Sequence, residues 1–144
     1  MTFEYFVVYG RAPKFRRTLL FKLASQILKH ENHSAEKITV VLAGDDLLLD
    51  LNKKFLQHDY RTDVISFDLG EKGIINGEIY VSVDRARIQA KRYNVKTKTE
   101  VLRLIIHGLL HLAGWEDATR SQKLRMRRRE NEYIRWFQIM SRKR

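Results

Sequence analysis

The chain has 144 residues and a net charge of +11 at pH 7, because 28 Lys and Arg residues outnumber 17 Asp and Glu residues. It contains no cysteine, which excludes disulfides, cysteine nucleophiles and zinc sites built from cysteine. The length predicts one domain spanning residues 1–144, and an isoelectric point near 10.1 favours a nucleic-acid partner.

Runs of aromatic and β-branched residues predict the strands, and apolar residues at helical spacing predict the helices. In chain order we expect a strand at 3–9, a helix at 13–30, a strand at 38–42, a helix at 45–55, strands at 64–67 and 78–83, and helices at 84–93, 97–114 and 119–141. Pro13 favours the start of the first helix, because its missing N–H costs least there. Thr97 and Glu100 have the spacing of a capping box.

The order of these elements is β-α-β-α-β-β-α-α-α. Helices separate the first three strands, which favours parallel crossovers, whereas the last two strands are close enough in sequence for an antiparallel hairpin. We therefore predict an α+β fold in which about five helices pack on a mixed four-stranded sheet.

The segment 107–117, His-Gly-Leu-Leu-His-Leu-Ala-Gly-Trp-Glu-Asp, is the strongest candidate for a functional site. A helix places His107 and His111 one turn apart on one face, where both imidazoles can reach one metal ion at about 2.0–2.1 Å for zinc. Gly114 can adopt the left-handed conformation that ends a helix and reverses the chain. Asp117 can then return beneath the histidines as a third ligand, which leaves a position open for water.

The surrounding helix is apolar on nearly every side, so its two histidines need polar partners, and a metal ion satisfies both at once. Metalloproteases with the H-E-x-x-H motif carry a glutamate base directly after the first histidine, where this chain has Gly108. Glu116 is a candidate for the role of that catalytic base; the other interpretation is an ordinary solvated side chain.

The pattern His-Gly-x-Leu-His-Leu-x-Gly-Trp-x-Asp closely resembles the signature of the YbeY family of metal-dependent endoribonucleases. Two further blocks in the family's order resemble it as well, and the likeness covers most of the chain. These blocks are Leu51-Asn52 with Phe55 and then Thr62–Phe67, and Gly77-Glu78-Ile79 followed by Ala90.

The resemblance implies a zincin-like fold with one zinc ion per chain. It implies cleavage of single-stranded RNA in the maturation of the 3′ end of 16S rRNA and in ribosome quality control. The expected partner is rRNA in the small ribosomal subunit, bound by a monomer. Thr62, Asp63 and Ser66 are then expected to contact substrate, although Asp63 and Ser66 can equally serve only to end and cap a strand.

The chain departs from the family pattern at two positions. The family usually has a third histidine where this chain has Asp117, and a carboxylate there lowers the positive charge of the site and alters metal preference. The family usually has an arginine, thought to act at the phosphate, where this chain has Leu56. Arg61 is a candidate for a replacement cation in catalysis; the other interpretation is an ordinary exposed arginine.

The C-terminal helix is strongly basic, with ten Lys or Arg residues between positions 120 and 144. Because this helix begins close to the proposed metal site, Arg127 and Arg128 are expected to bind the phosphates of the substrate. An apolar stripe on the same helix is expected to pack on the sheet. It consists of Tyr133, Trp136, Phe137 and Met140.

Two other functions are compatible with these motifs. One is a non-catalytic ribosome-assembly factor with a structural zinc ion. The other is a metzincin-like metalloprotease, which the missing glutamate and the positive charge disfavour. The chain has no run of about 20 apolar residues and its first residues do not resemble a signal peptide, so we expect a cytoplasmic protein without membrane contact.

Overall fold

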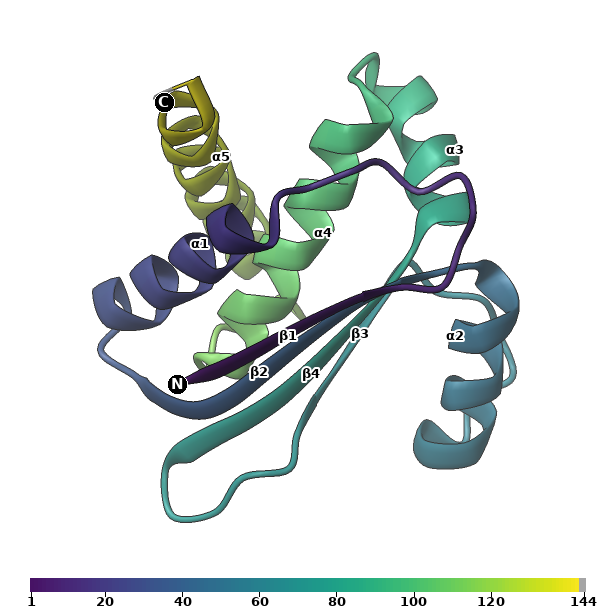
Figure 1. The fold of residues 1–144 in the computed structure, drawn as a ribbon. Helices are drawn as coiled ribbons and strands as arrows, with labels where there is room; N and C mark the ends of the chain where they lie inside the picture. Colours follow the sequence, from purple (N-terminus) through teal and green to yellow (C-terminus); the bar gives the residue numbers. More distant parts are fainter. Residues whose placement is uncertain (143–144) are drawn as a thin grey trace.

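The fold is taken from a computed structural model, which describes residues 1–142. It is α+β, with one mixed four-stranded sheet and, in the described residues, five α-helices (Figure 1). The predicted fold class and order of elements are therefore confirmed. The elements are β1 (Thr2–Val7), α1 (Arg17–His30), β2 (Ser34–Ala43), α2 (Asp45–Leu51), the π-helical turn η1 (Asn52–Leu56), β3 (Val64–Asp68), β4 (Ile74–Ser82), α3 (Val83–Tyr93), α4 (Thr97–Leu112) and α5 (Arg120–Arg142).

The sheet has the strand order β1-β2-β4-β3. β1 and β4 run parallel to β2, and β3 runs antiparallel to β4 as the predicted hairpin. The expected parallel crossover from β2 to β3 is wrong, because β4 takes the place beside β2 and β3 lies at the edge. β4 is nine residues long with five of them buried, whereas β3 has five residues and only one buried, so the longer strand occupies the interior of the sheet.

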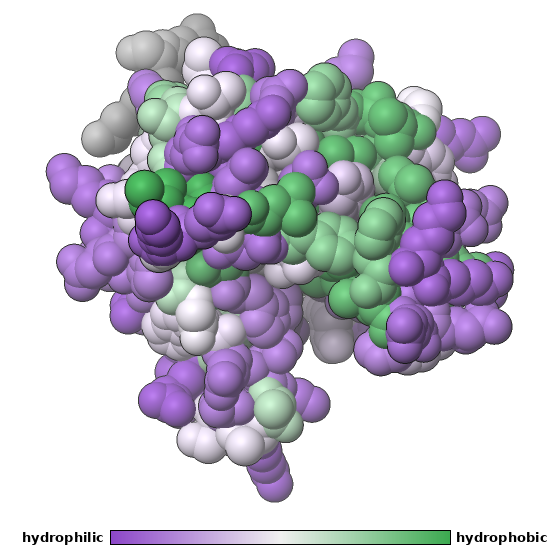
Figure 2. Space-filling model, turned by 90° about the horizontal axis from the view of Figure 1, so that it is seen from below, coloured by the Kyte–Doolittle hydropathy of each residue, from purple (hydrophilic) through white to green (hydrophobic). Residues whose placement is uncertain are grey.

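The helices lie unequally on the two faces of the sheet. Figure 1 shows α1 and α4 over one face, with α5 beyond them, and α2 on the other side. The main core lies under α1 and α4, and a small second cluster of Val41, Ala43, Leu48 and Ile65 lies beneath α2. Figure 2, seen from below, shows apolar side chains on the less covered side of the molecule.

Helix α5 packs against α4 and α1, so its apolar stripe forms a second helical layer and the predicted contact with the sheet is wrong. Tyr133 and Phe137 of that stripe are buried, while Trp136 and Met140 are half-buried. The sheet beneath and the helices above together surround α4, which explains why α4 is apolar on nearly every side. No helix among residues 1–142 is both long and apolar enough to span a bilayer.

Several helix ends differ from the predictions because tertiary contacts override local signals. α1 begins at Arg17 rather than near Pro13, since the preceding segment is extended and the Phe15 ring packs edge-on against Phe137. Thr97 does not cap α4, and Glu100 instead pairs with Arg103. A capping box forms instead at the start of α5: Thr119 Oγ1 accepts from the Gln122 backbone N–H, and Gln122 Oε1 accepts from the Thr119 backbone N–H.

Candidate metal centre

The last turns of α4 bring three polar side chains together. His107 Nε2 lies 2.9 Å from His111 Nε2. Asp117 Oδ2 lies 3.2 Å from His107 Nε2 and 3.4 Å from His111 Nε2. Gly114 has a φ of 95°, which is the left-handed conformation expected of it, and this reversal carries Asp117 back to the helix.

These three atoms fit a divalent metal ion. Two ligands placed about 2.0–2.1 Å from one ion in tetrahedral geometry lie roughly 3.3 Å apart, and the three separations here are 2.9, 3.2 and 3.4 Å. Two imidazole nitrogens and one carboxylate oxygen are a donor set that zinc accepts, with one position left for water. The structure thus brings together the three predicted ligands.

Glu130 supports the centre from α5. Its Oε2 lies 2.7 Å from His107 Nδ1, and its Oε1 accepts a hydrogen bond from Arg103 Nη1 at 3.3 Å. With only 3% of its surface exposed, Glu130 has both carboxylate oxygens partnered. A carboxylate on Nδ1 keeps the proton on that nitrogen and leaves Nε2 free to bind metal.

The same contact changes the protonation of His107. Burial alone lowers the pKa of this imidazole, but the hydrogen bond and the negative charge of Glu130, with a further contribution from Asp117, raise it overall. In the protein without metal, His107 therefore holds its proton to higher pH than a free histidine.

A second buried group of α4 also has a shifted pKa. Burial raises the pKa of the Glu100 carboxyl, and the positive charge of Arg103 opposes this rise.

A cleft of about 520 Å³ opens beside His107 and Asp117, between α3, α4 and α5. Its walls carry both signs of charge: Lys123 and Arg127 come from α5, and Asp63 precedes β3. Asp63 accepts a hydrogen bond from Gln89 Nε2 at 3.0 Å, which fixes the carboxylate at the cleft wall. This cleft is where a substrate can approach the metal ligands.

Some of the other predicted residues reach the cleft and others do not. Asp63 and Arg127 line it, whereas Thr62, Ser66 and Arg128 are absent from its lining. Thr62 and Ser66 are half-buried beside or within β3, and Arg128 is exposed on α5.

The two proposed catalytic side chains point elsewhere. Arg61 pairs with Asp45, with 3.6 Å between Nε and Oδ2, at the start of α2. Glu116 accepts a hydrogen bond from Gln122 Nε2 at 3.2 Å and lines a separate hollow beside Trp115. The structure therefore brings neither side chain to the metal ligands.

Glu130 and Arg103 are functional candidates that the sequence analysis did not identify. Glu130 is one of only two acidic residues within the basic C-terminal segment, and that isolation is the one sequence signal that could have indicated it. Its partner His107 is 23 residues away, so the pairing depends on how α5 crosses α4.

Comparison with known proteins agrees with the motifs. The model of the family described as Endoribonuclease YbeY matches residues 12–138. The Endoribonuclease YbeY of Chloroherpeton thalassium is 42% identical over 113 residues, which cover 78% of this chain and 80% of that protein. The one of Flavobacterium psychrophilum is 37% identical over 115 residues, covering 80% and 82%. The solution structure of TM1509 from Thermotoga maritima has a TM-score of 0.64 at 28% identity and covers 96% of this chain and 91% of that one.

Proposed function

Because the chain belongs to the YbeY endoribonuclease family, we propose that it hydrolyses phosphodiester bonds of single-stranded RNA at one zinc ion per chain. The observation that carries this proposal is the group of His107, His111 and Asp117, with Glu130 hydrogen-bonded behind it. The proposed substrate is the 3′ end of 16S rRNA in the small ribosomal subunit, during maturation and quality control. We propose that the enzyme acts as a cytoplasmic monomer.

The residues of the cleft have separable roles in this proposal. The two Nε2 atoms and Asp117 Oδ2 bind the metal, and Glu130 holds the proton on His107 Nδ1. A zinc ion supplies a bound water of lowered pKa and an electrophile for a phosphoryl oxygen. Arg127 and Lys123 place positive charge at the cleft wall. There they can stabilise the negative charge that develops on the phosphate as a phosphodiester bond is cleaved.

The first test is cleavage of a 3′-extended fragment of 16S rRNA, with and without a chelator. We expect cleavage by the wild type that disappears in the chelator and in His111→Ala. His33→Ala is the matched control, because His33 is exposed and outside the metal group; this variant is expected to cleave at the wild-type rate.

Two outcomes would contradict the proposal. Equal cleavage by the wild type and His111→Ala would identify a contaminating nuclease. Tight RNA binding without cleavage by any variant would instead favour the assembly factor with a structural metal ion, for which Leu56, in place of the family's arginine, is the supporting observation.

A further inference from the structure

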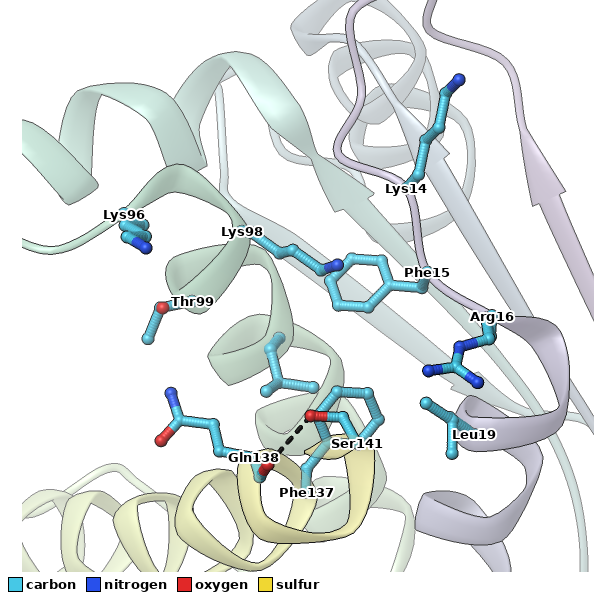
Figure 3. A pocket seen from close by; sticks show the side chains of 11 residues that line it. Lys14, Phe15, Arg16, Leu19, Lys96, Lys98, Thr99, Phe137, Gln138 and Ser141 are labelled. Carbon is cyan, nitrogen blue, oxygen red and sulfur yellow. Dashed lines mark hydrogen bonds between the residues drawn. The ribbon is translucent and has the colours of Figure 1, made fainter. Parts of the chain in front are cut away.

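A second cavity, of about 440 Å³, lies on the other side of α4 from the metal cleft. It is enclosed by the segment before α1, the first turn of α4 and the last turns of α5 (Figure 3). It shares no lining residue with the metal cleft. We name it the α1–α4–α5 cavity.

Aromatic and aliphatic side chains form part of its wall. The ring of Phe15 projects from the extended segment before α1 and meets Phe137 of α5 edge-on, with 6.2 Å between the ring centroids. Phe137 and Leu102 are buried beneath the cavity, at 5% and 3% exposure, whereas Phe15 is only half-buried. Part of the Phe15 ring is therefore open to a ligand.

Cations surround this aromatic wall. Arg16, Lys96 and Lys98 are exposed and line the cavity, and the described residues that line it include no Asp or Glu. Lys98 extends across the cavity, and its ammonium lies 5.1 Å from the centroid of the Phe15 ring (Figure 3). Thr99 and Gln138 add neutral polar groups to the same wall. The cavity thus combines positive charge, an accessible aromatic ring and hydrogen-bonding groups.

A ligand that matches all three features carries an anionic group and a flat ring with polar edges. We propose that the α1–α4–α5 cavity binds one nucleotide of a single-stranded RNA, with its base against Phe15 and its phosphate against Lys96 and Lys98. Sites for single strands combine aromatic stacking with a positively charged path for the backbone in this way. An exposed cation–π contact is weaker than the stacking of a base, so a base can displace the Lys98 ammonium toward the phosphate.

The position of the cavity relates it to the proposed nuclease site, and this step rests on the proposed function. The two lie on different sides of α4, but Tyr93 lines the metal cleft and Lys96 lines the cavity, so the short turn between α3 and α4 runs from one to the other. Lys91 and Arg92 add positive charge in the last turn of α3. A strand whose scissile bond lies at the metal can therefore continue over this turn, which makes the cavity a site for a nucleotide flanking the cleavage point.

Uridine monophosphate is a suitable probe, because it contains no phosphodiester bond to be cleaved. We would titrate it into the metal-loaded protein and follow backbone amide shifts by NMR. Shifts are expected at residues 14–16, 96–99 and 137–141. Lys96→Glu combined with Lys98→Glu is expected to weaken binding at these amides at least tenfold. Lys22→Glu with Lys29→Glu makes the same change in net charge at exposed positions of α1 and should leave binding within twofold.

A second variant separates stacking from charge. Phe15→Leu keeps an apolar side chain against Phe137 but removes the aromatic face, so it should weaken uridine monophosphate binding several-fold without changing the binding of inorganic phosphate. The proposal is overturned if the cavity amides do not shift, if phosphate alone binds as tightly as the nucleotide, or if the two lysine pairs have equal effects. The lysine pairs test the proposal even if Phe15→Leu destabilises the fold.

Cleavage kinetics show whether the cavity serves the nuclease. On an RNA of 12 nucleotides or more, Lys96→Glu with Lys98→Glu should raise KM with kcat unchanged. Unchanged KM together with lost nucleotide binding would overturn the assignment to the substrate strand. If the wild type cleaves no RNA, the proposed function fails, and the nucleotide titration still decides whether the cavity is a binding site.

Discussion

Glu130 contacts one of the proposed metal ligands from a different helix. Its two oxygens contact His107 Nδ1 at 2.7 Å and Arg103 Nη1 at 3.3 Å. Because a buried polar group is costly unless it is paired and hydrogen-bonded, these two contacts compensate the burial of the Glu130 side chain beneath the site. Arg103 thereby stabilises Glu130, and Glu130 holds the His107 ring in place.

Replacing Glu130 by glutamine should weaken metal binding without removing a ligand. The amide keeps the size of the side chain but loses the charge that favours Nδ1 protonation, and such changes typically cost about 10–100-fold in metal affinity. Competition with a chromogenic zinc chelator measures this. Glu132→Gln is the matched control, since Glu132 is exposed and pairs only with Arg129 in the described residues. Equal affinities for the two variants would contradict the role of Glu130.

The raised pKa of His107 predicts how the stability of the metal-free protein depends on pH. Burial opposes this rise, and the hydrogen bond and charge of Glu130 cause it. A group whose pKa is raised on folding contributes stability below its unfolded value, about 6.5, and that contribution is lost as pH rises through the folded pKa. Urea unfolding of the chelated wild type between pH 6 and 8 should show this loss, and Glu130→Gln should reduce it. Identical pH profiles would refute the assignment.

At the scale of elements, the packing distance between α4 and β4 depends on two glycines, Gly108 of α4 and Gly77 of β4. A Cβ atom at Gly108 would lie 2.7 Å from Ile79 Cγ2, and one at Gly77 would lie 2.4 Å from Leu112 Cδ1. Real Cβ atoms do not approach this closely, so a side chain at either position would force its neighbour to move, and α4 packs closely on β4 at these two glycines. Because Gly108 directly follows His107, this close packing also sets the position of the first metal ligand.

Gly108→Ala should therefore destabilise the fold by about 1–3 kcal/mol, since the added methyl group overpacks a tight core. Chemical denaturation measures the change in the free energy of unfolding. Gly10→Ala is the control, because a Cβ atom there meets nothing within 4 Å; it should be neutral or slightly stabilising. A Gly108 variant as stable as the Gly10 variant would show that α4 can shift freely on β4.

At the scale of the whole molecule, cations contribute to the walls of both cavities. The net charge is +11, and Lys123 and Arg127 at the metal cleft add to the cations of the α1–α4–α5 cavity. Neither cavity lies on the side of α2, where the surface has apolar side chains (Figure 2). This distribution suits a ligand whose phosphates follow the helical side of the molecule.

RNA binding should consequently depend strongly on salt. Each neutralised phosphate of a single strand contributes about −0.7 to the slope of log K against log salt concentration. Lys123→Ala with Arg127→Ala should make the slope shallower by about 1.4, if each side chain neutralises one phosphate. Lys22→Ala with Lys29→Ala removes two exposed cations of α1 and should leave the slope unchanged. If fluorescence anisotropy gave the same RNA affinity for the wild type at low and at physiological salt, the proposed phosphate contacts would be contradicted.

The grouping of the three proposed metal ligands and the order of elements followed from the sequence because they depend on local geometry. His107 and His111 are one helical turn apart, and Gly114 needs only its own backbone freedom to return Asp117 to them. Alternating and helical patterns are equally local, which explains why the strands and helices were found in the right order. The family motifs are also runs of neighbouring residues, and comparison with known proteins confirmed them.

Only the tertiary structure decided which distant residues meet. It placed β4 rather than β3 beside β2, turned Arg61 toward Asp45, and set Glu130 against His107. It also began α1 later than Pro13 favoured and formed a cavity from three separate segments. Periodicity shows which face of a helix is buried, but the partner of that face depends on how helices and strands cross. Contacts across such crossings join residues far apart in the chain, so no local pattern encodes them.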